Sequence, residues 1–388
     1  MKSNYEPLGK HIRLVDYRNS EEVTSTVLGI SIDKEFMPSV ANVIGTDLSR
    51  YKLISKGLFA CNPMHVGRDE RLPIALYEKD NAAIVSPAYF MFEIIDRDVL
   101  NEEYLMMWFR RPEFDRECWF MTDGSVRGGI SWDDLCRIQL PVPPYERQLD
   151  VVESYRAITR RIAMKKEIND NLSETAQALF KSWFVDYEPF ELEAENSPVG
   201  WSRTTLGEKL TTSTQSVNPQ KMNSTYVWHY SIPAFDCEKL PIKDIPSSIL
   251  SNKYNVPSNA ILVSKLNPET KRVWRTLTCF ENAICSTEFI VFSAKQAKHK
   301  AFYFLLFNTK EFVDFLVSNA TGSTNSRMRV KPASSLDYEF LCPPDNIIDA
   351  FCEKVEPLLE QIDNNTLEIR KLNELVPLAV ARMMSSRN

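Results

Sequence analysis

Two stretches of the chain carry apolar side chains at alternating steps of three and four residues, with polar residues between them. One follows Leu140–Pro144 and continues to about Phe184, and the other follows Leu341–Pro344 and continues to about Met384. A period near 3.5 residues over several heptads is typical of helices that pack along a partner helix. About 40 helical residues at ~1.5 Å each give a rod of ~60 Å, which is too long for one compact core. We therefore predict two long spacer helices, and the alternative is an ordinary helical hairpin inside a core.

The apolar seam of each predicted helix falters at a matching place. The first seam is interrupted near Lys166 and Asn169, and the second near Thr366. Pro357 and Pro377 lie inside the second pattern, where each is expected to kink or break the helix. The seam positions that we assign to the helix pair are Val152, Tyr155, Ile162, Leu172 and Leu179 in the first helix, and Val355, Leu359, Ile362, Ile369, Leu372 and Val376 in the second.

The two halves of the chain repeat each other at a distance of 200 positions. Ala83–Ser86 and Ala283–Ser286 precede similar apolar and aromatic runs, which predict buried strands. Each run is followed by an amphipathic pattern that predicts a helix, over Glu102–Phe109 in the first half and over Ala301–Val317 in the second. The repeat therefore includes the regions before the long helices as well as the helices themselves.

This repeat predicts an α+β chain in which two globules of mixed strands and helices alternate with two long helices. The predicted segments are 1–140 and 201–340 for the globules, 141–186 and 341–388 for the helices, and 187–200 for an exposed linker. A globule of about 140 residues is large enough to bury a core of its own. Two similar halves can pack about a pseudo-twofold axis, so we expect the helices to run antiparallel as a coiled coil that holds the globules apart.

Composition narrows the class of protein. The 388 residues are 44% hydrophobic and 25% charged, as in ordinary globular proteins. The first residues lack a secretory pattern and no apolar run is long enough to span a membrane, so we expect a cytoplasmic protein. The eight cysteines form no C-x-x-C pair, which indicates reduced thiols and argues against a zinc site or another metal centre.

Catalytic motifs are not evident in the sequence. It contains no phosphate-binding loop, no G-x-G-x-x-G turn and no G-x-S-x-G elbow. Asn62-Pro63-Met64 resembles the Asn-Pro-Pro-aromatic motif of amino-methyltransferases only faintly, because the second proline and the aromatic residue are absent. The four histidines are far apart along the chain. We therefore expect no catalytic residues and no cofactor in this chain, and an enzyme with an unrecognised site is the least favoured interpretation.

Basic and polar residues gather on predicted loops of both globules. The net charge of −6 does not by itself indicate nucleic-acid binding, because what matters is whether basic residues share a face. A polar turn recurs in both halves, with Arg127 and Arg327 200 positions apart, and arginine can bind phosphates or guanine edges. The candidate DNA-contacting residues are Arg68, Arg71, Ser125, Arg127, Lys265, Lys271, Arg272, Ser323, Thr324, Asn325, Arg327, Arg329 and Lys331. For any one of them a solvated surface charge is the alternative.

Charges also differ between the two long helices. A basic run from Arg156 to Lys166 occupies part of the first helix, and Glu356, Glu360 and Asp363 occupy the same part of the second. Two differently charged solvent faces explain this pattern, and so does a docking surface for a partner subunit. The sequence leaves both interpretations open.

Three segments carry a resemblance to a known family. Leu140–Gln148 reads Leu-Pro-x-Pro-Pro-x-x-x-Gln before a long helix, the helix closes with Phe180–Tyr187, and Pro198–Trp201 with Leu206–Glu208 starts the second half. In this order, and with the duplication, the chain resembles the specificity subunit of type I restriction-modification systems. In the second half, the segment before the helix lacks the earlier proline and the glutamine of the first.

The resemblance implies a function. Such subunits are non-catalytic and bind double-stranded DNA at a bipartite target, with one target-recognition domain for each half-site. Their helices set the gap between the half-sites and dock two methyltransferase subunits, which bind S-adenosylmethionine and methylate adenine, and two motor-nuclease subunits can join. The competing hypothesis is a coiled-coil scaffold that joins partner proteins without reading DNA sequence.

Overall fold

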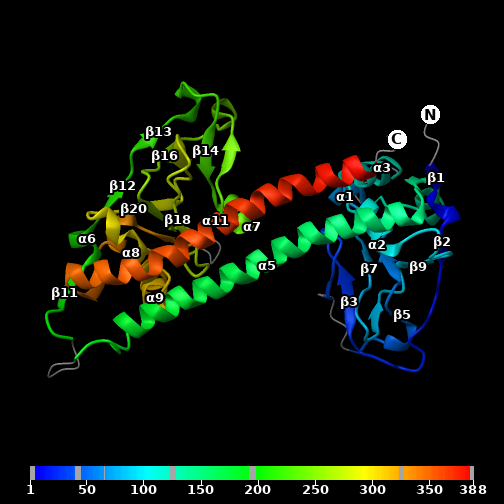
Figure 1. Ribbon diagram of the computed structural model, residues 1–388, viewed down its shortest axis with the longest axis horizontal. Coiled ribbons are helices and arrows are strands. Elements are labelled where there is room, and N and C mark those ends of the chain that lie inside the picture. Colours follow the sequence, from blue (N-terminus) through cyan, green and yellow to red (C-terminus); the bar gives the residue numbers. More distant parts are fainter. Residues whose placement is uncertain are drawn as a thin grey trace. The chain divides into compact units, whose positions relative to one another are not determined.

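The computed structural model describes residues 5–39, 45–64, 66–122, 128–191, 198–322 and 327–384. The chain divides into two compact units. The N-terminal unit comprises Met1–Arg160 and Asn373–Asn388, and the C-terminal unit comprises Arg161–Leu372. Each long helix therefore contributes residues to both units. Figure 1 shows the ribbon with its elements labelled.

The N-terminal unit is built on two four-stranded sheets. One has the order β2-β9-β6-β7, with bounds Ile12–Leu14, Phe90–Ile94, Phe59–Cys61 and Ile74–Leu76. The other has the order β4-β3-β8-β5, with bounds Phe36–Pro38, Val27–Ile30, Ala83–Val85 and Lys52–Ile54. Its β3 and β8 run parallel, and the remaining pairs in both sheets are antiparallel. Four short helices and one more strand pair complete the unit: α1 (Val66–Asp69), α2 (Glu102–Phe109), α3 (Pro112–Phe120), α4 (Trp132–Arg137), and β1 (Tyr5–Pro7) against β10 (Gln139–Pro141).

The C-terminal unit repeats this topology. Its first sheet has the order β12-β20-β17-β18, with bounds Leu210–Ser213, Phe289–Ala294, Ala260–Ser264 and Val273–Arg275. Its second has the order β13-β16-β19-β14-β15, with bounds Ser216–Val217, Lys253–Asn255, Ala283–Cys285, Val227–Tyr230 and Ile242–Asp244. The unit also contains two short strand pairs, β11 (Ser202–Thr205) against β23 (Glu339–Cys342) and β21 (Ala320–Thr321) against β22 (Arg329–Val330). Its short helices include α6 (Leu206–Lys209), α7 (Ile232–Glu238), α8 (Lys300–Phe307), α9 (Lys310–Ser318), α10 (Pro332–Ser335) and the 3-10 helices Pro219–Lys221, Pro246–Ser248 and Ala297–His299.

The matching strand orders confirm the tandem duplication. Among the described strands, the second sheet of each unit contains one parallel pair, β3 with β8 in the N-terminal unit and β14 with β19 in the C-terminal unit. The buried strands predicted after Ala83 and Ala283 are present as β8–β9 and β19–β20. The α+β fold class predicted from the sequence is correct.

The predicted helix over Ala301–Val317 is wrong in one respect, because two helices occupy that stretch. Asn308 is the C-terminal cap of α8, and the Thr309 side chain accepts a hydrogen bond from the Phe312 backbone N–H at the start of α9. A threonine at this position favours a new helix start over continuation. The matching helix of the first half, Glu102–Phe109, was predicted correctly and is likewise followed by a separate helix.

The two long helices are α5 (Tyr145–Phe184) and α11 (Asp345–Met384), and they pack together in an antiparallel arrangement (Figure 1). Within the C-terminal unit, Arg161 of α5 pairs with Glu368 of α11, whereas Phe180 contacts Phe351. Residue numbers therefore rise along one helix as they fall along the other. This direction agrees with the coiled coil predicted from the two seams.

The expected break at the prolines of the second helix does not occur. Helix α11 is continuous through Pro357 and Pro377. Both prolines are exposed. Each proline ring therefore lies on the solvent side of the helix, away from its packed side.

The predicted seam positions lie on the packed sides of α5 and α11. Helix α5 also contributes to the core of each unit: Val151 and Val152 belong to the core of the N-terminal unit, and Ala176 and Phe180 to that of the C-terminal unit. The buried seam residues are Val152, Ile162, Val355, Leu359 and Ile369, and the half-buried ones are Tyr155, Leu172, Leu179, Ile362, Leu372 and Val376.

Among the residues that the structure describes, no helix is long and apolar enough to cross a membrane.

Candidate nucleic-acid interface

In the N-terminal unit, the segment that follows β6 forms backbone hydrogen bonds with residues 128–130. The Gly67 backbone N–H donates to the Gly128 carbonyl at 3.0 Å, and the Ile130 N–H donates to the Pro63 carbonyl at 3.1 Å. A Cβ atom on Gly129 would lie 2.8 Å from the Pro63 carbonyl oxygen, so only glycine fits this close approach. The segment after β6 and the residues after position 127 therefore form one paired loop.

The C-terminal unit contains the corresponding pair of segments. The Asn267 N–H donates to the Met328 carbonyl at 2.8 Å, and the Val330 N–H donates to the Lys265 carbonyl at 3.0 Å. Strands β21 and β22 pair across the turn between them. The same architecture thus recurs at equivalent places in both units, which fits two sites of one kind.

Four of the candidate DNA-contacting residues meet at the paired loop of the C-terminal unit. Arg327 and Lys331 are exposed, and Lys265 is half-buried beside them through its pairing with Val330. Arg329 forms two hydrogen bonds with the Glu288 carboxylate, at 3.0 and 3.2 Å. The candidates Ser125, Arg127, Ser323, Thr324 and Asn325 lie outside the residues that the structure describes.

The remaining candidates are distributed differently. Arg68 lies on α1 next to Gly67, within the paired loop of the N-terminal unit, and binds the Asp69 carboxylate at 2.7 and 2.9 Å. Arg71 lies 3.3 Å from Asp33. The other two side chains reach helices of the C-terminal unit: Lys271 donates to the Asn308 carbonyl at the end of α8, and Arg272 binds Asp236 on α7. Among the described residues, the side chains of Arg71, Lys271 and Arg272 thus bind partners outside the two paired loops.

Two aromatic residues at the end of α3 were missed by the sequence reasoning. Phe120 is 87% exposed and Trp119 44% exposed. Helix α3 packs against α1, which carries Arg68. Helical phase was the available signal, because Phe114 and Cys118 are buried and Phe120 must then face outward together with Arg116, one turn earlier. An exposed aromatic ring beside an arginine can pack on nucleic-acid bases.

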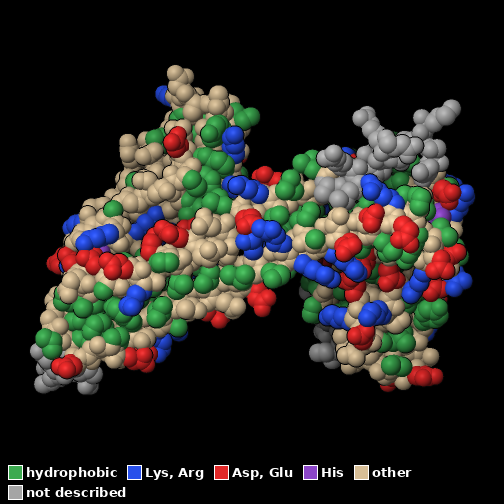
Figure 2. Space-filling view, in the orientation of Figure 1, with side chains coloured by type: hydrophobic (Ala, Val, Ile, Leu, Met, Phe, Trp, Pro, Cys, Tyr) green, Lys and Arg blue, Asp and Glu red, His purple; other side chains and the backbone are tan. Residues whose placement is uncertain are grey.

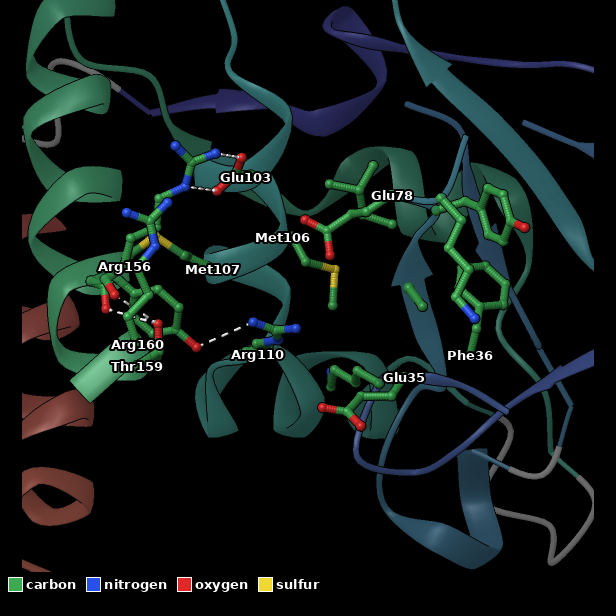
Figure 3. Close-up of a pocket in the computed structure, with 16 residues that line it drawn as sticks. Glu35, Phe36, Glu78, Glu103, Met106, Met107, Arg110, Arg156, Thr159 and Arg160 are labelled. Atoms are coloured by element: carbon green, nitrogen blue, oxygen red, sulfur yellow. Dashed lines mark hydrogen bonds and ion pairs between the residues drawn. The ribbon is translucent and has the colours of Figure 1, made fainter. Parts of the chain in front are cut away.

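A second feature of the N-terminal unit is a cavity of about 540 Å³ lined by α2, α5 and the β3–β4 region. Figure 3 shows Arg156 turned toward Glu103 and Arg110 turned toward α5, where it donates to the Tyr155 hydroxyl at 3.2 Å. Glu35 and Glu78 also line the cavity, so its charge is mixed. Figure 2 likewise shows basic and acidic side chains interspersed over this unit. The cavity therefore lacks the uniformly basic lining of a phosphate-binding cleft.

The charged runs on the long helices form ion pairs within each unit. Arg156 pairs with Glu103, and Arg161 and Lys165 both pair with Glu368. On α11, Glu356 and Asp363 pair with Arg275 of β18. Ion pairs with side chains of the same chain therefore involve part of the charge on these runs.

The cluster around Arg275 shifts two pKa values in opposite directions. Burial raises the pKa of the Asp363 carboxyl to about 6, although Arg275 and Lys300 pull it back. Burial also lowers the pKa of Lys300 to about 8, with repulsion from Arg275 adding to the effect.

Among the residues that the structure describes, no group of three or more His, Cys, Asp or Glu side chains is placed to hold a metal ion.

Comparison with known proteins shows which proteins this chain resembles. No family model matches the chain. The chain is 25% identical over 308 residues to the specificity subunit of type I restriction enzyme MjaIX of Methanocaldococcus jannaschii, a match that covers 73% of this chain and 68% of that protein. It is also 25% identical over 195 residues to the specificity subunit of type I restriction enzyme HindI of Haemophilus influenzae, over 49% of this chain and 41% of that one.

A solved structure shows the same fold. The crystal structure of the S subunit of a type I restriction-modification system from M. genitalium superposes with a TM-score of 0.58 at 13% identity, covering 99% of this chain and 96% of that one. These comparisons confirm the resemblance inferred from the sequence. The chain is therefore similar in sequence to specificity subunits of type I restriction enzymes.

Proposed function

We propose that this chain is the sequence-specific DNA-binding subunit of a type I restriction-modification enzyme. The observation that carries the proposal is the duplicated unit, in which the same strand order presents the same paired loop twice. Two related but different loops suit a bipartite target, because each unit can read one half-site independently. The curated relatives, which are specificity subunits, support this interpretation.

Residues 1–140 and 201–340 would be the two target-recognition domains, and the helices of 141–186 and 341–388 would set the gap between half-sites. The chain itself would be non-catalytic. Two methyltransferase subunits would dock on it, bind S-adenosylmethionine and methylate the target, and motor-nuclease subunits would join in a restriction complex. A scaffold that never reads DNA is the competing function, but the duplicated paired loops give it no specific support.

A gel-shift experiment tests the proposal. The chain, alone and with its methyltransferase partner, is incubated with a pool of random duplexes at a stated salt concentration, and bound duplexes are sequenced. We expect enrichment of one bipartite motif with a fixed gap. Absence of any bound fraction, with the partner present, would reject DNA reading.

Arg327→Ala is expected to weaken DNA binding by about 1–3 kcal/mol if the arginine contacts a base, because a bidentate contact to guanine is lost. If it contacts a phosphate instead, affinity falls for all sequences and the salt dependence becomes shallower by about one counterion. Binding isotherms at three salt concentrations distinguish the two cases. The matched control is Lys310→Ala, since Lys310 is an 80% exposed cation on α9 that pairs with Asp314 of the same helix. Equal affinities of the two variants and the wild type would remove Arg327 from the interface.

Phe120→Ala is expected to reduce the affinity for DNA about tenfold, because loss of base–aromatic packing costs ~1–3 kcal/mol. The effect should depend on the sequence of the half-site read by the N-terminal unit only. Val317→Ala on α9 is the control, since Val317 is 41% exposed on the corresponding helix of the other unit. Binding is measured on duplexes in which one or the other half-site is randomised, which separates the effects on the two half-sites. An equal loss of affinity on both duplexes would contradict the assignment of Phe120 to one half-site.

A further inference from the structure

The helix pair contains a buried polar layer where both apolar seams falter. Asn365 of α11 is 2% exposed, and its side-chain N–H donates to the Asn169 side-chain oxygen of α5 at 2.9 Å. The Asn365 oxygen accepts from Lys165 of α5 and from Gln361, each at 2.9 Å. The Asn169 amide in turn donates to the Thr366 hydroxyl at 3.2 Å. The side chains of both asparagines are thereby engaged across the interface.

An ion-pair group flanks this layer. Glu368 of α11 accepts from Arg161 at 2.5 Å and from Lys165 at 2.8 Å. Lys165 therefore bridges the asparagine layer and the carboxylate, and its side chain is only 17% exposed. These contacts make the region around Asn365 chemically distinct from the apolar stretches of the seam on either side.

The apolar part of the seam permits more than one alignment of the two helices. Val355, Leu359, Ile362, Ile369 and Leu372 recur at helical spacing, so a slip of one heptad exchanges one aliphatic side chain for another. The asparagine layer does not permit such a slip. A shift of seven residues would place Leu358 or Leu372 opposite Asn169, and the buried amides would lose their partners.

We propose that the Asn169–Asn365 layer fixes the register of α5 against α11 and thereby determines the gap between the two half-sites. The second part rests on the proposed function, in which the helices set that gap. Buried asparagine is known to specify register in coiled coils at a cost in stability, because an apolar pair in its place packs better but tolerates several alignments. The layer is therefore a specificity determinant that touches no DNA.

The aromatic contacts of Phe180 with Phe351 and Phe302 form a second constraint about three turns along α5. They anchor the end of α5 to the core of the C-terminal unit. The test must therefore remove the asparagine layer alone and ask whether the aromatic anchor suffices.

The test uses the full chain with Asn169→Leu and Asn365→Leu combined. Spin labels are placed at Ala163→Cys and Asn364→Cys, which are exposed positions on the two helices, and the exposed Cys237 and Cys279 are replaced by serine. Pulsed electron-resonance spectroscopy then measures the distance distribution. Asp170→Leu is the matched control for the added leucine, because Asp170 is an exposed residue of α5 next to Asn169.

We expect one narrow distance for the wild type and for Asp170→Leu. The double variant should melt at a higher temperature than the wild type. It should also show a second distance population, because a slip of one heptad moves the two labels about 10 Å relative to each other along the helix axis. A single unchanged distance in the double variant would overturn the proposal, because the register would then be held without the layer.

Methylome sequencing of a host that carries each variant tests the consequence for the target. The wild type should methylate a bipartite motif with one gap length, and the double variant should also methylate motifs with a second gap length. If the wild type methylates no bipartite motif, the proposed function fails, while the spin-label result still decides whether the layer sets the register. A second distance population with one unchanged gap would overturn the link between register and gap.

Discussion

Asp115→Ala is expected to destabilise the N-terminal unit by about 3–5 kcal/mol, the cost typical of breaking a buried ion pair by removing one partner. Asp115 and Lys34 are 8% and 5% exposed, and their charged atoms lie 2.7 Å apart. The same carboxylate oxygen accepts from the Leu72 backbone N–H at 3.0 Å, and the Lys34 ammonium also donates to the Phe109 carbonyl. One pair thus joins the β3–β4 loop, the end of α2 and α3.

The effect should depend on pH in a defined direction. Burial already lowers the pKa of Lys34, and Asp115 partly restores it. A lysine whose pKa is lower in the folded state contributes stability that is present above its unfolded pKa and is lost as the pH falls through its folded pKa. Removal of Asp115 lowers the folded pKa of Lys34 further. The difference from wild type should therefore be larger at pH 7 than at pH 10.

Urea denaturation followed by tryptophan fluorescence measures the change, since Trp108, Trp119 and Trp132 all lie in the N-terminal unit. Asp80→Ala is the matched control, because its pair with Lys56 is 88% and 61% exposed, so solvent screens the interaction and little change in stability is expected. A change of equal size in the two variants would show that the buried pair does not stabilise the unit.

The fold was largely predictable because it follows from local patterns. Heptad spacing located both long helices, and the 200-residue repeat located matching buried strands in the two halves. The errors came from local choices that long-range packing decides. Pro357 and Pro377 are tolerated because they lie on the exposed side of α11, and the single helix predicted after Ala301 divides at Thr309 because that side chain caps α9.

The candidate site was predictable only in part. The loop that carries Arg327 was located from its composition, but its pairing with Lys265 joins residues more than 60 positions apart, which no local pattern reports. The faltering seam near Asn169 was visible in the sequence as well. Its hydrogen bond to Asn365, 196 positions away, was not. Side-chain partners such as Glu103 for Arg156 likewise depend on how the helices pack on the sheets.

Arg275→Ala is expected to destabilise the C-terminal unit by about 2–4 kcal/mol at neutral pH. Arg275 is 11% exposed in its side chain and pairs with Glu356 and Asp363, so its removal leaves two partly buried carboxylates without their cation. The expected cost is below that of a fully buried pair because Glu356 and Asp363 remain 38% and 23% exposed. It is reduced further because loss of Arg275 removes a repulsion that lowers the pKa of Lys300, which can then stay charged beside Asp363.

The pH dependence identifies the carboxylate responsible. The pKa of Asp363 is about 6 in the folded chain, above its ordinary value, so its contribution to stability is present at acid pH and is lost as the pH rises through 6. Without Arg275 the folded pKa rises further, and the loss continues to higher pH. The destabilisation should therefore be small near pH 4 and large at pH 8, as measured by urea denaturation at both values. Arg275→Lys keeps the cation and should show a smaller pH dependence. Lys298→Ala removes a lysine whose side chain is 61% exposed beside Asp349, and it should show almost no pH dependence. A penalty for Arg275→Ala that is equal at pH 4 and pH 8 would mean that lost packing, and not the unpaired Asp363 carboxylate, causes it.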